Sequence, residues 1–364
     1  MKPWELDPQR YESLWTEKYQ CVETSFAPFD APAAEYFASP ATAYRVRAEF
    51  RLWHDGDDLN YVMFDPDRPK EPIAVTDFPQ ALQPIQEAMP RLIDALRSNP
   101  VLRRKLFQAE FMASRSDTLI ITLAYHRPLD EQWELQASNL ARTLNASIIG
   151  RSRKQKRIVG RDWVEESFAI ERRNFRYRSY DQSFVQPNVY ANESMLNWVH
   201  RQAADAHEDL LELYCGNGNF TLPLATRYER VLATEVAKSG TRAAQENLRR
   251  NKVENVDLIR LSAEEVVQAL NGVREFQRLK NLSQPLNNFE FSAVFVDPPR
   301  AGLDEETCQL IQRFDRIYYV SCNPETLRAN LERLTITHAV KALAFFDQFP
   351  YTKHIESAVV LERR

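Results

Sequence analysis

The stretch Asp209-Leu210-Leu211-Glu212-Leu213-Tyr214-Cys215-Gly216-Asn217-Gly218-Asn219-Phe220 decides the fold of this chain. Its first half, Asp209 to Tyr214, is expected to form a strand. Two glycines follow, although the chain has only 8 glycines in 364 residues, against a usual share of about 7%. They indicate a backbone that needs positive φ or the close approach of a ligand. A strand, a glycine loop and a helix in this order predict the start of a doubly wound α/β sheet.

The same alternation of strand and helix continues from about residue 184 to the end of the chain. Further strands are expected at residues 230–234, 256–261, 292–296 and 316–320. Residues 265–290 are too long for a simple connection and predict a helical insertion, and residues 343–349 and 356–362 predict terminal strands. The pattern predicts a Rossmann-like catalytic unit over residues 184–364.

The first half of the sequence has mixed α and β character without this alternation. Residues 44–53 alternate apolar and polar side chains, as a strand with one buried face does, and a turn leads to a returning strand at residues 59–64. A helix at 80–97, a strand at 118–125, a helix at 130–144 and a strand at 146–150 complete the pattern. We therefore expect a separate α+β unit over residues 1–183.

Composition limits the classes of protein to which the chain can belong. No run of eighteen apolar residues predicts a membrane span, and the start from Met1 to Asp7 is too polar and acidic for a secretory signal. The cysteines form no CxxC pair and no metal-ligand cluster; they are Cys21, Cys215, Cys308 and Cys322. This spacing favours a reduced, cytoplasmic protein without a metal or an iron–sulfur cluster.

The formal net charge of −4 argues, taken alone, against a nucleic-acid partner. Residues 151–178 nevertheless hold ten Lys or Arg against four Asp or Glu, interleaved with aromatic residues. Such a stretch can follow a phosphate backbone. It can equally be a solvated charged face, and the sequence alone leaves both interpretations open.

Acidic residues follow two of the expected strands at the edge where ligands bind in such folds. Glu235 closes the second strand and can accept hydrogen bonds from both hydroxyls of a ribose. Because the glycine loop lacks the full GxGxxG fingerprint, NAD is disfavoured and S-adenosylmethionine is the better candidate. Asp297-Pro298-Pro299-Arg300 ends the fourth strand. Asp297 can face the cationic end of that cofactor or a target base, and Arg300 can donate to a base carbonyl or a phosphate; a surface acid and a simple turn are the alternatives.

Cys322 lies where an apolar strand ends and a helix is expected to begin. Asn323 is a good N-cap and Pro324 suits the first helical position. Helix-end amides stabilise anions, so we expect the Cys322 thiol to be biased towards thiolate and to act as a nucleophile. The alternative is a small, buried, unreactive side chain.

Five ordered motifs resemble those of the RNA 5-methyluridine methyltransferases. They are Gln186-Pro187-Asn188, the segment from Leu213 to Phe220, Asp297-Pro298-Pro299-Arg300, Ser321-Cys322-Asn323-Pro324, and the tail from Asp347 to Glu356. The resemblance covers nearly the whole chain and is closest to the tRNA (uracil-5-)-methyltransferase subgroup, which makes ribothymidine at position 54 of the T-loop. The rRNA-modifying relatives usually carry an oligonucleotide-binding domain and cluster-binding cysteines, and this sequence has neither.

The resemblance implies a class I S-adenosylmethionine-dependent methyltransferase domain preceded by an RNA-binding domain. It implies that Cys322 is the nucleophile and Glu356 the general base. The residues implied to bind the cofactor are Gln186, Tyr214, Asn219, Glu235 and Asp297. The implied partner is tRNA, with transfer-messenger RNA as a second substrate, and neither a membrane nor an obligate protein partner is implied.

Phe107 is a candidate for stacking on an RNA base, or alternatively a core residue, and Arg300 is a second candidate RNA contact. Three rival functions remain open at this point. They are an rRNA uridine methyltransferase, an amino-group methyltransferase, and an RNA-binding or RNA-folding protein with a vestigial cofactor pocket.

Overall fold

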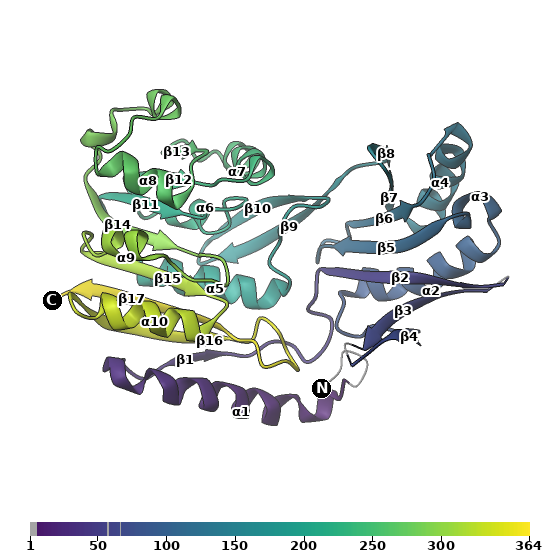
Figure 1. Cartoon of the computed structure of the whole chain (residues 1–364), viewed down its shortest axis with the longest axis horizontal. Coiled ribbons are helices and arrows are strands. Elements are labelled where there is room, and N and C mark those ends of the chain that lie inside the picture. The colour runs from purple at the N-terminus through teal and green to yellow at the C-terminus, as the bar shows by residue number, and fades with distance from the viewer. Residues whose placement is uncertain (1–5, 57, 66) are drawn as a thin grey trace.

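The computed structural model describes residues 6–56, 58–65 and 67–364 (Figure 1). Most of the start on which the expectation of no secretory signal rests, Met1 to Glu5, lies outside these residues. In the described part of the chain, no helix combines the length and the apolar character that crossing a membrane requires.

An eight-stranded sheet, here called the C-terminal sheet, has the order β1-β16-β17-β15-β14-β11-β12-β13. Its parallel strands are β11 (Asp209–Leu213), β12 (Arg230–Thr234), β13 (Val256–Ile259), β14 (Phe291–Val296) and β15 (Arg316–Ser321). β16 (His338–Phe346) and β17 (Glu356–Arg363) are antiparallel to each other, and β17 is antiparallel to β15. The chain runs outward from β11 to β13 and then returns to β14 on the other side of β11. A switch point therefore lies between β11 and β14, as expected for a Rossmann-like sheet.

Helices lie between consecutive strands from β11 to β16, as the predicted alternation requires, and one more precedes β11. They are α5 (Val189–Gln202), α6 (Thr221–Leu224), α7 (Lys238–Asn251), α8 (Ala263–Leu270), α9 (Glu305–Ile311) and α10 (Pro324–Leu334). α8 begins with a capping box between Ser262 and Glu265, which satisfies two amides that the first turn leaves free. The predicted helical insertion consists of α8 and two 3-10 turns, Gln277–Asn281 and Leu286–Asn288.

The N-terminal sheet has seven strands in the order β4-β3-β2-β5-β6-β7-β8. They are β2 (Arg47–Asp55), β3 (Asp58–Asp65), β4 (Arg68–Ala74), β5 (Leu106–Ala113), β6 (Leu119–Tyr125), β7 (Ser147–Ser152) and β8 (Gln155–Val159). The helices of this unit are α2 (Gln83–Arg97), α3 (Pro100–Arg103) and α4 (Glu131–Leu144). Along β2 every second side chain is buried, and Phe50 shares a core with Leu92 of α2 and Trp133 of α4. The α+β character predicted for this half is confirmed.

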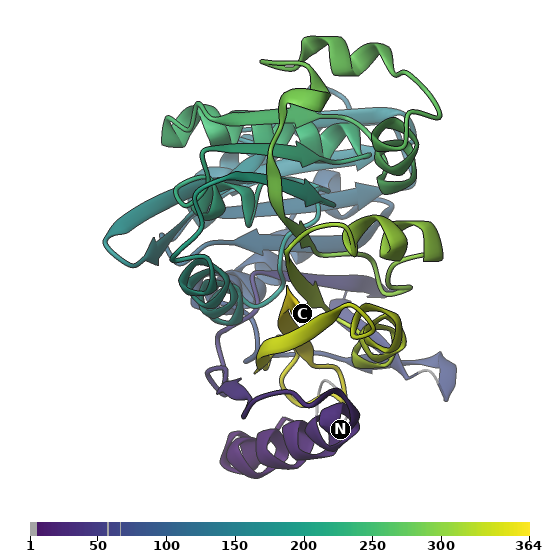
Figure 2. The same ribbon diagram turned by 90° about the vertical axis from the view of Figure 1, so that its left-hand side faces the viewer.

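The first described helix and strand belong to the C-terminal sheet. β1 (Glu35–Phe37) pairs in parallel with β16, and α1 (Tyr11–Glu23) runs below that edge of the sheet (Figures 1 and 2). Tyr11 and Trp15 share a buried cluster with residues of the C-terminal sheet. A division at residue 183/184 stays a prediction, but the structure assigns α1 and β1 to the later unit, which the sequence pattern did not indicate.

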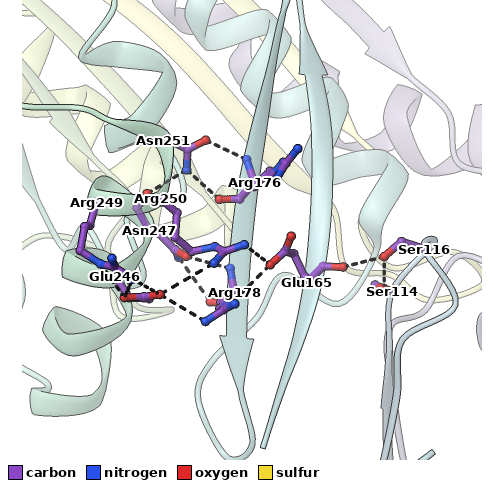
Figure 3. A network of polar contacts seen from close by, with 10 residues as sticks. All are labelled: Ser114, Ser116, Glu165, Arg176, Arg178, Glu246, Asn247, Arg249, Arg250 and Asn251. Atoms are coloured by element: carbon purple, nitrogen blue, oxygen red, sulfur yellow. Dashed lines mark hydrogen bonds and ion pairs between the residues drawn. The ribbon is translucent and has the colours of Figure 1, made fainter. Parts of the chain in front are cut away.

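A two-stranded hairpin that the sequence analysis missed, β9 (Trp163–Ile170) and β10 (Arg173–Tyr180), lies between the two sheets. Figure 3 shows its bonds to both sides. The amides of Arg176 and Arg178 donate to the side chains of Asn251 and Asn247 of α7, at 2.9 and 2.8 Å. On the other side, Ser116 donates to the Glu165 carbonyl at 2.9 Å.

Several cations of the basic stretch at 151–178 pair with carboxylates of the protein itself. Arg178 pairs with Glu165 and Glu246 at 3.3 and 3.2 Å, and Arg151 and Arg157 pair with Asp181 and Glu134. Part of the positive charge therefore stabilises the hairpin and its surroundings.

Candidate active site

A cavity of about 820 Å³ opens at the carboxyl ends of the parallel strands, at the switch point of the C-terminal sheet. Its walls come from both sheets, from the hairpin and from the segment that precedes α5. Eight of the nine residues singled out in the sequence line it: Gln186, Tyr214, Asn219, Glu235, Asp297, Arg300, Cys322 and Glu356. Phe107 does not line this cavity.

The glycine loop after β11 has the conformation that its composition predicts. Gly216 and Gly218 have φ of 58° and 81°, a region that glycine occupies without strain. The Gly216 amide donates to one carboxylate oxygen of Glu235 at 3.0 Å, and the Ala237 amide donates to the other at 2.6 Å. A Cβ at Gly240 would lie 2.9 Å from Cγ of Glu235. Close packing and two amide donors therefore fix the Glu235 carboxylate beside the cavity.

Amide side chains at the cavity are paired with one another. Asn219 and Asn192 exchange two hydrogen bonds of 2.8 and 3.0 Å. Gln348 donates to the side-chain oxygen of Gln186. Tyr214 adopts a left-handed conformation with φ of 62°, which is uncommon outside glycine and concentrates at functional sites. Burial raises the pKa of Tyr214 to about 12.

Cys322 lies between the end of β15 and α10, as predicted, and the Asn323 side chain caps the helix by accepting from the Glu325 amide at 3.1 Å. Ser321 faces Ser357 in the antiparallel pair of β15 and β17. Cys322 follows Ser321 and Glu356 precedes Ser357, so both residues lie next to the last pair of this register, and both line the cavity.

The expectation that the helix end biases Cys322 towards thiolate is wrong for the protein without ligands. Burial, with contributions from the carboxylates of Glu356 and Asp297, raises the pKa of the Cys322 thiol to about 11. The nearby Arg300 lowers that pKa by a smaller amount. Desolvation and two acidic neighbours therefore outweigh the helix terminus.

Two carboxyl groups of the site, those of Asp297 and Glu356, have raised pKa values. Burial raises the pKa of Asp297 to about 7, and burial together with the charge of Asp297 raises the pKa of Glu356 well above its ordinary value. Glu356 opens β17, and the five residues that follow it are buried, so its carboxyl group lies away from solvent.

Glu212 is a residue of the site region that the sequence analysis missed. It is fully buried on β11, and neither of its carboxylate oxygens has a hydrogen-bond partner among the described residues. Burial raises its pKa to about 8, with the charge of Asp297 adding to the shift. A Glu inside an otherwise apolar strand was the available signal, since an acid is rarely fully buried without a partner.

The two candidate RNA contacts occupy different places. Arg300 is exposed at the cavity, and its Nη2 lies 3.1 Å from Nδ1 of His354. Phe107 is half-buried in a second groove of about 700 Å³ on the N-terminal sheet, where it stacks on His126 with ring centroids 4.0 Å apart. The second groove also contains Arg127, Arg151 and Arg153. Phe107 is therefore available at a surface and is not a residue of the buried core.

Comparisons with known proteins agree with this architecture. The profile of the family described as "tRNA (Uracil-5-)-methyltransferase" matches residues 10–364. Proteins named "tRNA/tmRNA (uracil-C(5))-methyltransferase" from Stutzerimonas stutzeri and Ectopseudomonas mendocina are 51% and 53% identical to the chain, with 99% of each sequence covered in both cases.

Among solved structures, the Pyrococcus abyssi tRNA (uracil-54, C5)-methyltransferase in complex with S-adenosyl-L-homocysteine has the same fold, with a TM-score of 0.73 at 19% identity. The match covers 96% of this chain and 83% of that one. With a family profile that spans nearly its full length and relatives above 50% identity, this chain belongs to the tRNA (Uracil-5-)-methyltransferase family.

Proposed function

We propose that this protein transfers a methyl group from S-adenosylmethionine to C5 of uridine 54 in the T-loop of tRNA, and to the corresponding loop of transfer-messenger RNA. The observation that carries the proposal is the cavity, which Cys322 and Glu356 line together with the cofactor candidates. The names of the relatives support the choice of substrate. A cytoplasmic location is part of the same proposal.

The residues of the cavity fit S-adenosylmethionine. The cavity volume of about 820 Å³ lies in the range of about 300–1,000 Å³ that small-molecule sites have. Glu235 suits the two ribose hydroxyls, and Asp297 suits the cationic amino-acid end. Gln186, Tyr214 and Asn219 supply further polar contacts. When bound, the cofactor supplies an electrophilic methyl group on a sulfonium.

Cys322 activates the uracil ring, because C5 of uracil is a poor nucleophile. The Cys322 sulfur bonds to C6, and the electron pair of the C5–C6 double bond moves into an enolate. S-adenosylmethionine, held by Glu235 and Asp297, would supply the methyl group to C5 of that enolate and would keep the electron pair of the broken bond on its sulfur. Arg300, which already lowers the pKa of the Cys322 thiol, would stabilise the thiolate that begins this sequence.

Glu356 completes the reaction as the general base. Its carboxylate takes the proton from C5, the C5–C6 double bond reforms, and the bond between C6 and the Cys322 sulfur breaks to return the thiolate. The buried setting that raises the pKa of Glu356 makes it a stronger base than an ordinary carboxylate. A cationic ligand beside Asp297 offsets the negative charge that raises the pKa of the Cys322 thiol.

The target uridine must leave its loop before it can reach Cys322, at a cost of a few kcal/mol. Phe107 offers stacking to an exposed base, which contributes about 1–3 kcal/mol per base. Its groove lies apart from the catalytic cavity, so we propose that RNA contacts the N-terminal sheet at the same time as the uridine enters the cavity.

The test is to incubate Glu356→Gln with labelled tRNA transcript and S-adenosylmethionine and to separate the products on a denaturing gel. A covalent protein–RNA adduct is expected to accumulate, because methylation can proceed while release cannot. Cys322→Ala is expected to form neither adduct nor product. Glu332→Gln and Cys21→Ala are matched exposed controls. The mechanism is refuted if Glu356→Gln yields no adduct or Cys322→Ala turns over normally.

The same assay separates the rival functions. An rRNA uridine methyltransferase would modify rRNA and leave tRNA unmodified. An amino-group methyltransferase attacks with nitrogen, so Cys322→Ala would keep its activity. An RNA-binding protein with a vestigial pocket would give no methylated nucleoside with either RNA.

A further inference from the structure

A lysine of the first helix, Lys18, is hydrogen-bonded to the loop that precedes Glu356. Residues 347–355 connect β16 to β17, and both Phe349 of this segment and Glu356, the first residue of β17, line the catalytic cavity. The Nζ atom of Lys18 on α1 donates to the Asp347 carboxylate at 2.5 Å, to the Phe349 carbonyl at 3.0 Å and to the His354 carbonyl at 3.1 Å. All three donors of the ammonium are therefore used, and all three acceptors belong to this loop.

The ion pair within this network is almost completely removed from solvent. The side chains of Lys18 and Asp347 are 8% and 1% exposed. The second carboxylate oxygen of Asp347 accepts from the Tyr11 hydroxyl at 2.9 Å, and the same hydroxyl accepts from the Ser39 amide at 2.6 Å. A buried pair with its remaining positions satisfied holds a defined geometry, and removal of one partner leaves an uncompensated charge.

The loop is tied to the site at other points as well. The Asp347 carbonyl accepts from Asn188, and Gln348 donates to Gln186 of the cavity wall. His354 lies 3.1 Å from Arg300. Glu356 itself is 2% exposed and follows the Lys18-bound His354 carbonyl by two residues. A shift of the His354 carbonyl away from Lys18 would therefore also shift Glu356, which is two residues further along the chain.

We propose that Lys18, through Asp347 and the two loop carbonyls, is a positioning residue for the catalytic base Glu356. Lys18 does not line the cavity, so its effect is transmitted through the loop and not through contact with a substrate. A compact ammonium suits this task, since it directs three donors from one point, whereas a planar guanidinium cannot. The inference rests on the proposed role of Glu356.

The test measures steady-state turnover and the fraction of covalent protein–RNA adduct for Lys18→Met, with Glu356→Gln beside it. We expect kcat to fall by about 10- to 100-fold, as small displacements of catalytic groups do. We also expect the adduct fraction to rise and KM for tRNA to fall together with kcat, because only the release step, which follows the methyl transfer, needs the base. Lys280→Met, an exposed lysine of the insertion, is the matched control and should behave as the parent protein.

The outcomes separate the inference from the proposed function. If Glu356→Gln accumulates adduct while Lys18→Met keeps the adduct fraction and kcat of the parent protein, Lys18 does not position the base. If Glu356→Gln itself gives no adduct, the role of Glu356 is wrong and the inference falls with it. Should Lys18→Met fail to fold, Lys18→Arg keeps the charge and is measured in the same way. If Lys18→Arg has the same kcat and adduct fraction as the parent protein, the claim that a compact ammonium with three donors is required here is wrong.

Discussion

The Cys322 thiol is expected to react slowly with iodoacetamide near neutral pH in the protein without ligands. Burial and the carboxylates of Glu356 and Asp297 raise the pKa of this thiol to about 11, and the thiolate is the reactive form. The perturbation is a change of pH, combined with Asp297→Asn, which removes one of the two charges that disfavour the thiolate.

The magnitude follows from the fraction of thiolate. At about pH 8, a thiol with a pKa of about 11 is ionised in about one molecule in 1,000, whereas an ordinary thiol with a pKa of about 8.5 is ionised in about one in four. A thiolate with a higher pKa is also more nucleophilic, which reduces the difference in reaction rate by about tenfold. Cys322 should therefore react about 20-fold more slowly than a cysteine in an unstructured model peptide, before any steric hindrance.

The assay is peptide mass spectrometry of alkylated protein over a series from about pH 7 to about pH 10. The rate at Cys322 should keep rising about tenfold per pH unit across this range, since the thiol does not reach its pKa. Asp297→Asn should raise the rate at about pH 8, and Asp77→Asn, an exposed control, should leave it unchanged. A rate that levels off below about pH 9, or a rate that Asp297→Asn does not change, would refute the electrostatic account.

Three further predictions concern the fold, the cofactor and the RNA. The pKa of Glu212 is about 8 in the folded protein and about 4.3 in an unfolded chain, so the unfolded chain loses this proton first as pH rises. Folding stability should therefore fall by up to a few kcal/mol between about pH 4 and pH 8, and Glu212→Gln should remove that part of the slope in thermal unfolding. Gly240→Ala would bring Cβ to 2.9 Å from Cγ of Glu235 and displace that carboxylate. We therefore expect isothermal titration to show weaker binding of S-adenosylhomocysteine. Unchanged binding would contradict the assignment of Glu235. Phe107→Ala should weaken binding of a T-arm RNA by about 1–3 kcal/mol, with cofactor binding unaffected, and equal RNA affinity would remove Phe107 from the interface.

The sequence was informative wherever a local pattern determines the structure. The strands β11, β12, β14 and β15 are short and apolar, and caps such as Asn323 mark where the following helix begins. Because parallel strands place their carboxyl ends at one edge, residues at the ends of these four strands could be assigned to one site. The cavity confirms that Cys322, Glu356 and the cofactor candidates lie together.

What the sequence did not predict depends on contacts between distant parts of the chain. β1 is only three residues long, and its strand character comes from pairing with β16. The pKa of Cys322 was expected to be lowered because the helix end is local, whereas Glu356 and Asp297 approach it only in the fold. In the same way, Lys18 gives no signal in the sequence, since all its acceptors lie more than 300 positions away.

The pairing of β1 with β16 has a consequence for synthesis on the ribosome. Glu35 of β1 faces Ala344 of β16, so the partner of this strand is translated about 300 residues later. At about 5–20 residues per second, β1 and α1 wait for about 15–60 s before their binding surface exists. During that interval the apolar side of the first helix is open to chaperones, while the seven-stranded sheet can already fold behind it.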